Sequence, residues 1–172
     1  DGALLLALIH VIIDKGLYDR ECIARYTNGG QLVNQVPGDD EFGLFAMDAD
    51  GDVVNPDYPH NKFWWNRHTD SAVPTHTPGA DPRLRGEYLM PDGKAVKPAF
   101  QLLVERVAGY TPEWASGITG IPVETIYRLA HEMGVTARDH KIHLPIAWTD
   151  SWGVEHQTVT GNPVAFHAMR GL

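Results

Sequence analysis

The stretch 109–133 constrains the fold of this chain most, because it specifies two short helices joined by a tight turn. Thr111 is suited to cap the first helix, and Pro112 fits its first turn. Gly120 ends this helix, and Pro122 opens the next one. A helical hairpin is therefore predicted, and by itself it implies packing and no chemistry.

The second of these helices carries apolar side chains at the three- and four-residue spacing of a single helical face. These residues are Ile126, Leu129, Ala130 and Met133. Gly134 follows them, and glycine is the commonest residue just beyond the end of a helix. We therefore expect the helix to end at Gly134.

The first 28 residues predict two further helices separated by Gly16. The apolar run 3–13 is interrupted by His10 and is shorter than the roughly 18 residues of a membrane-spanning helix, so a buried helix is expected. In the next helix, capped by Asp19, the single cysteine, Cys22, lies on one face with Ile23 and Tyr26. We interpret this thiol as a small structural hydrophobe. One cysteine also excludes an internal disulfide or a cysteine-rich metal site within this sequence.

The middle of the chain is less regular. Residues 44–47 and 53–54 flank an Asp- and Gly-rich stretch, 48–52, which predicts a hairpin turn. Residues 55–92 contain Pro, His and aromatic side chains without a helical or alternating period, so they predict a long irregular loop. Its aromatic content is too high for a disordered linker. A turn at 90–94 and a helix over 98–108 are expected next, and a second hairpin is expected from 141–148 and 155–160.

Charge and metal motifs exclude several functions. The net charge of −8 and the scattered Lys and Arg argue against nucleic acid as a partner. The acidic stretch at 48–52 fails the calcium-loop pattern, because glycine falls at its fourth position and Pro59 at its twelfth. His140 and His143 lack a third ligand at standard spacing. No metal site is therefore predicted.

The densest aromatic cluster runs from Trp64 to His68 and leaves two interpretations open. It could line a groove for a substrate or quinone, with Arg67 attracting an anion. The favoured interpretation is a loop held to another part of a larger enzyme, or to a partner subunit, by apolar contact.

Three strings in order, "GYTPEW" (109–114), "ITGIP" (118–122) and "IYRLA" (126–130), resemble the large catalytic subunit of the molybdopterin oxidoreductases, the dimethyl-sulfoxide-reductase superfamily. The apolar helix 1–13 with "GLYD" (16–19) resembles the helix that follows this family's "PGTD" turn. Family subunits are several times longer, with a cysteine cluster and a molybdenum ligand that this sequence lacks. We therefore expect an internal fragment that is inactive alone.

The expected fold class is α/β, a fragment of a multi-domain enzyme. Helices are expected to pack on part of a sheet, with two β-hairpins and a long irregular aromatic loop. Three segments are predicted: 1–37, a helical segment after the dinucleotide-binding turn; 38–97, a hairpin and the loop; and 98–172, a helical hairpin, a second β-hairpin and re-entry to the cofactor cleft.

The resemblance implies two-electron chemistry at a molybdenum bis(molybdopterin guanine dinucleotide) centre, with electrons carried by [4Fe-4S] clusters. Neither cofactor would be wholly bound by this chain. The excursion "TDSWG…TVTGNP" is most similar to the subgroup handling sulfite, thiosulfate, tetrathionate or polysulfide. The competing hypothesis is a non-catalytic scaffold or subunit-docking module. Expected partners are a small-molecule substrate, the rest of the catalytic subunit, an iron–sulfur electron-transfer subunit, and a membrane anchor subunit, with a slight preference for the cytoplasmic face of a membrane complex.

The same resemblance implies three site residues. Asp1 would lie beside the guanosine part of the cofactor, where a carboxylate can accept two hydrogen bonds from guanine; the alternative role is a simple helix N-cap. Arg170, together with His167, would approach the molybdenum pocket and bind an oxyanion substrate; the alternative for Arg170 is an ion pair with a core carboxylate.

Overall fold

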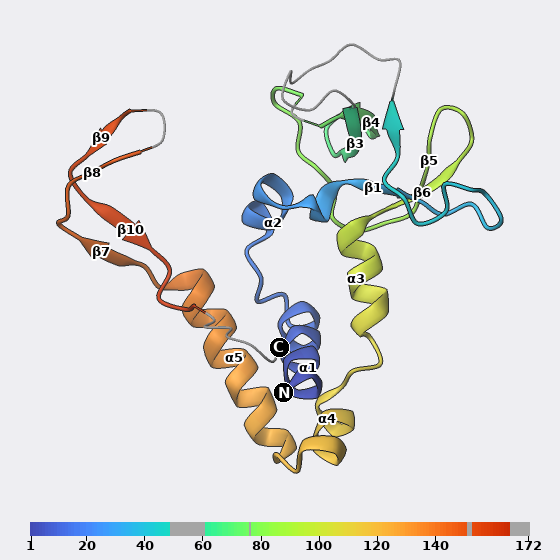
Figure 1. The fold of residues 1–172 in the computed structure, drawn as a ribbon. Helices are drawn as coiled ribbons and strands as arrows, with labels where there is room; N and C mark the ends of the chain where they lie inside the picture. The colour runs from blue at the N-terminus through green and yellow to red at the C-terminus, as the bar shows by residue number, and fades with distance from the viewer. Residues whose placement is uncertain (49–60, 76, 151–152, 166–172) are drawn as a thin grey trace. The chain divides into compact units, whose positions relative to one another are not determined.

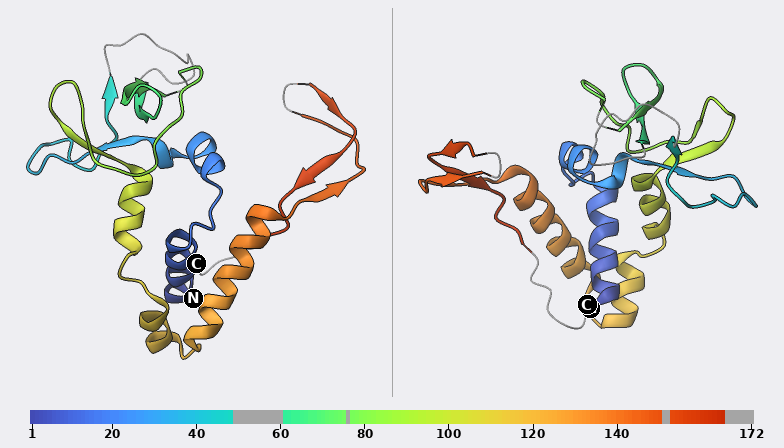
Figure 2. Two further views of the ribbon diagram at one scale, coloured as in Figure 1. Left: turned by 180° about the vertical axis from the view of Figure 1, so that it is seen from behind. Right: turned by 45° about the horizontal axis from the view of Figure 1, so that its top comes forward.

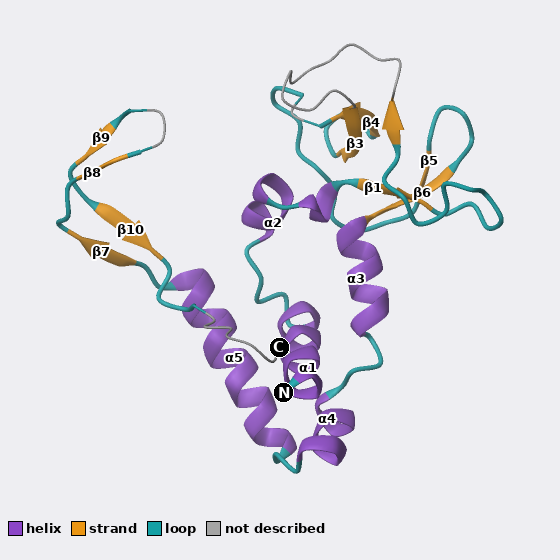
Figure 3. Cartoon of the chain, viewed as in Figure 1, coloured by secondary structure: helices purple, strands orange, loops and turns teal. Residues whose placement is uncertain are grey.

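The computed structural model describes residues 1–48, 61–75, 77–150 and 153–165 (Figures 1 and 3). The chain divides into two compact units. The first consists of Asp1–Tyr18 with Val107–Leu172, and the second of Asp19–Arg106. Helices and small antiparallel sheets are both present, which confirms the mixed α/β class. The three predicted segments, 1–37, 38–97 and 98–172, stay a prediction.

Three helices form the core of the first unit: α1 (Gly2–Asp14), α4 (Pro112–Thr119) and α5 (Val123–Asp139). They lie side by side in both views of Figure 2. The buried residues at their contact are Ala7, Leu8, Val11, Ala115, Ile126 and Ala130. The predicted helical hairpin is confirmed, since the Thr111 hydroxyl accepts a hydrogen bond from the Trp114 amide (3.3 Å) and Gly120 adopts a left-handed φ of 73°.

The prediction that α5 ends at Gly134 is wrong, because the helix continues to Asp139. Gly134 is buried within the helix, and a Cβ at this position would lie 2.7 Å from Cβ of Leu17. The residue is therefore required for close packing. Near the end of α5, Arg138 Nη1 donates a hydrogen bond to the carbonyl of Gly16 (3.1 Å), which holds the helix against the turn that follows α1.

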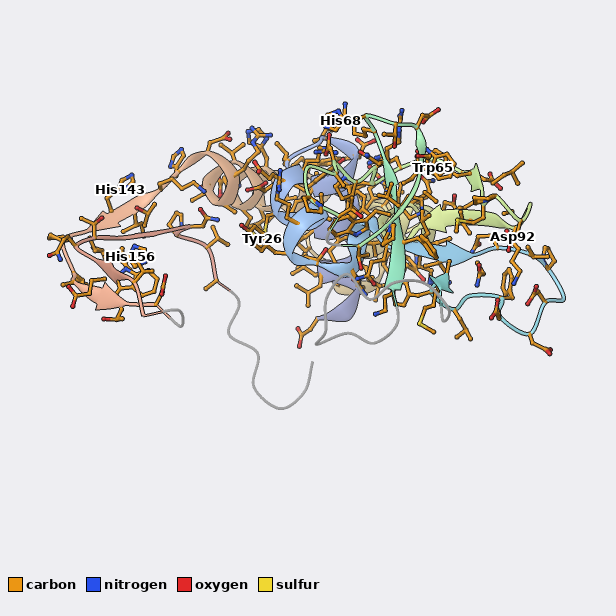
Figure 4. All side chains as sticks on the ribbon, turned by 90° about the horizontal axis from the view of Figure 1, so that it is seen from above. Tyr26, Trp65, His68, Asp92, His143 and His156 are labelled. Atoms are coloured by element: carbon orange, nitrogen blue, oxygen red, sulfur yellow. The ribbon has the colours of Figure 1, made fainter. Side chains whose placement is uncertain are left out.

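Beyond α5 the chain forms a two-stranded antiparallel structure, residues 141–150 and 153–161, which we call the β-arm. β7 (Ile142–Leu144) pairs with β10 (Val159–Gly161), and β8 (Trp148–Thr149) pairs with β9 (Glu155–His156). His143 and His156 mark the arm in Figure 4. The second predicted hairpin is confirmed.

The second unit begins with α2 (Arg20–Tyr26) and a short 3-10 turn, Asn28–Gly30. β1 (Leu32–Asn34), β6 (Ala95–Pro98) and β5 (Tyr88–Leu89) follow as a sheet in the order β1-β6-β5, and β6 leads into α3 (Ala99–Val107). The turn at 90–94 and the helix after it are confirmed.

The predicted cap of α2 is also confirmed, because the Cys22 amide donates to the Asp19 carboxylate (2.9 Å). The expected burial of its helical face is wrong. Cys22 is exposed, and Tyr26 is 80% exposed. The apolar spacing places these residues on one helical face, but Cys22 and Tyr26 of that face are exposed in the part of the chain that the structure describes.

A second sheet has the order β2-β3-β4, formed by Met47–Asp48, Asn61–Asn66 and Ser71–Pro74. Residues 55–92 are therefore not one irregular loop, since β3, β4 and β5 lie within them. Met47 pairs with Lys62, whereas the predicted partner strand at 53–54 and most of the turn at 48–52 lie outside the described residues. The sequence of β3 does not alternate between polar and apolar residues, because Trp64 and Trp65 are adjacent and point to opposite faces of the strand, and both are partly covered.

The prediction of a buried N-terminal helix is confirmed by α1, which buries Ala7, Leu8, Val11 and Ile13. Within the part of the chain that the structure describes, no helix is long and apolar enough to cross a membrane.

Candidate functional site

Asp1 stands at the start of α1 and is exposed. Its backbone carbonyl accepts the first helical hydrogen bond from the Leu5 amide (3.1 Å), whereas its side chain makes no capping hydrogen bond. The capping role of the side chain is therefore not observed, and a carboxylate in general is the double acceptor that the donor pair of a guanine base requires. The role of Asp1 as a cofactor contact stays a prediction. His167 and Arg170 lie outside the described residues, and their roles also stay predictions.

Two adjoining hollows lie within the second unit, beside α2. The first, of about 310 Å³, is lined by Arg20, Glu21, Ala24, Arg25, His68, Gly79, Ala80, Asp81 and Pro82. The second, of about 340 Å³, shares Arg25, Gly79, Ala80 and Pro82 and adds Tyr26, Trp64, Thr77 and Pro78. The tryptophan-containing cluster predicted from the sequence therefore contributes Trp64 and His68 to hollowed surface.

Asp81 is the electrostatic centre of the first hollow. Its carboxylate accepts from Nη2 of Arg20 at 2.7 Å and from Nη1 of Arg67 at 3.2 Å. Partial burial acts to raise the pKa of Asp81, but the Arg20 hydrogen bond and the charges of Arg20, Arg67 and His68 outweigh it and leave the pKa below its usual value. Arg20 also donates to the Pro82 carbonyl at 2.8 Å.

A buried asparagine holds this cluster in place. Asn66 Oδ1, at the end of β3, accepts from the amides of His68 (3.2 Å) and Asp81 (3.1 Å). The Arg67 amide in turn donates to the Asp81 carbonyl (2.9 Å). One side chain therefore fixes both the β3–β4 turn and the strand-like segment that carries Asp81.

The cations around the hollow are balanced by carboxylates. Arg25 pairs with Glu21 (3.0 Å), and Arg67, the residue that sequence analysis considered as an anion attractor, pairs with Asp81 (3.2 Å). No group of three or more His, Cys, Asp or Glu side chains suited to a metal ion occurs among the described residues. The cluster is thus best suited to hold α2 and the β3–β4 hairpin together.

Replacing Asp81 by asparagine should destabilise the second unit by about 1 kcal/mol at pH 7, because partly exposed ion pairs contribute roughly 0.2–1 kcal/mol each. The folded-state pKa of Asp81 lies below its unfolded value, so its stabilisation is present above the unfolded pKa and is lost as pH falls through the folded pKa. The difference in unfolding free energy between parent and Asp81→Asn should therefore shrink on acidification. Urea unfolding between pH 7 and pH 2 measures it.

The exposed Asp40 provides a matched control. Asp40→Asn should leave the unfolding free energy within about 0.5 kcal/mol of the parent, as ordinary surface substitutions do. An Asp81→Asn difference that stays constant or grows as pH falls would contradict a stabilising ionised Asp81.

No protein-family model matches the chain. Curated proteins do match it. The chain is 61% identical over 175 residues, across its whole length, to a sulfite dehydrogenase subunit of Allochromatium vinosum. It is 32% identical, over 77% of its length, to the perchlorate reductase alpha subunit of Dechloromonas aromatica. Over 37% of its length it is 40% identical to the molybdopterin-containing subunit of the arsenate respiratory reductase of Shewanella sp. strain ANA-3.

The resemblance to the molybdopterin oxidoreductases is confirmed. The chain spans 18%, 17% and 7% of the lengths of these three relatives, so each match is to a segment of the relative. Sequence analysis singled out Arg67 and His68 but neither Asp81 nor Arg20. Asp81-Pro82 reads only as a turn signal, so no local pattern could have found the cluster.

Proposed function

We propose that the polypeptide containing this chain is the catalytic subunit of a molybdenum oxidoreductase that oxidises or reduces a sulfur oxyanion by two electrons, with sulfite as the first candidate. The observation that carries the proposal is the 61% identity, over the entire chain, with the sulfite dehydrogenase subunit of Allochromatium vinosum. The identities with the perchlorate and arsenate reductase subunits are lower and cover less of the chain.

The proposed cofactor is molybdenum bis(molybdopterin guanine dinucleotide), which would supply the two-electron redox chemistry when bound. Within this chain, Asp1 would hold the guanine end, which agrees with an exposed carboxylate that makes no capping hydrogen bond. Arg170 would bind and orient the oxyanion with its planar guanidinium, and His167 would assist as a hydrogen-bond donor. These roles rest on residue type and on the family resemblance.

We further propose that electrons leave through [4Fe-4S] clusters to an iron–sulfur subunit, and that a membrane anchor subunit completes the enzyme. The relative with 61% identity is itself one subunit of its enzyme, which supports a multi-subunit assembly for the polypeptide proposed here.

Metal analysis and a sulfite assay on the purified full-length polypeptide test the proposal. We expect about one molybdenum per polypeptide and sulfite-dependent reduction of an artificial electron acceptor, with sulfite and water giving sulfate, two protons and two electrons. Perchlorate and arsenate with a reduced dye serve as competing substrates. Molybdenum with turnover of either of these instead would contradict the substrate. Absence of molybdenum and of all three activities would favour the non-catalytic docking module.

A further inference from the structure

We draw no further inference here: the strongest candidate, the pair of adjoining hollows beside α2 in the second unit, shares its lining with the ion-paired cluster around Asp81 already described, whose arginines are balanced by carboxylates, and nothing in the structure shows which segment or molecule covers it.

Discussion

Replacing Arg170 by alanine in the full-length polypeptide is expected to lower sulfite turnover by about 10²-fold, the loss expected when a reacting substrate is no longer held in its productive orientation. The reason is chemical. A guanidinium presents several N–H donors in a rigid plane and keeps its charge at every working pH, so it can bind and orient a negatively charged oxyanion. Because Arg170 would both bind and orient the oxyanion, KM should rise and kcat should fall.

Three variants sharpen this test. Arg170→Lys keeps the charge but loses the planar fork, so its turnover should lie between those of the parent and Arg170→Ala. Arg25→Ala is the matched control, because Arg25 pairs with Glu21 at the surface and should leave turnover unchanged. His167→Ala should reduce turnover less than Arg170→Ala. Molybdenum content must stay equal in all variants. Unchanged kcat and KM in Arg170→Ala would remove Arg170 from the proposed site.

The helical part of the first unit could be predicted because its signals are local. The Thr111 cap and the left-handed Gly120 act within a few residues of their own position, and both are present as expected. The 126–133 stripe likewise needs only its own spacing to indicate a buried face, and Ile126 and Ala130 are fully buried.

The parts that could not be predicted depend on contacts between distant residues. Trp65 stacks on Tyr88 with ring centroids 4.4 Å apart, and nothing near either residue in the sequence indicates that pairing. The β3–β4 hairpin was not predicted either, because the contacts that partly cover its tryptophans come from residues distant in the sequence. Asp81 joins Arg20 and Arg67, which are separated from it by 61 and 14 positions, so only the folded unit brings the cluster together.

For the candidate site residues, the sequence and the structure contribute different information. The expectation for Asp1 comes from the family resemblance, and the structure adds that its side chain makes no capping hydrogen bond. Propensity alone would have assigned it to capping, since aspartate is a favoured N-cap. For Arg170 and His167 the expectation comes from residue type and resemblance, and it is their substitution that will test it.

Gly134→Ala is expected to destabilise the first unit by about 1–2 kcal/mol, although alanine is the better helix former. In the interior of α5 the propensity gain is about 1 kcal/mol. The added Cβ would lie 2.7 Å from Cβ and 3.2 Å from Cδ1 of Leu17. Leu17 Cβ is fixed to the backbone and cannot move aside cheaply, and overpacking of this kind costs about 1–3 kcal/mol. Where the clash requires α5 and the Leu17 backbone to separate, the cost lies towards the upper end.

Gly117 supplies the control, because it also lies inside a helix, α4, but is exposed, and a Cβ there would have nothing within 4 Å. Gly117→Ala should therefore stabilise by about 0.5–1 kcal/mol, the ordinary helix-interior gain. Hydrogen exchange of the α5 and α4 amides, followed by mass spectrometry, measures both changes within the full-length polypeptide. If Gly134 is required for close packing, Gly134→Ala should lower the free energy of unfolding and Gly117→Ala should raise it. Stabilisation by both substitutions would mean that α5 and Leu17 are farther apart than the structure places them.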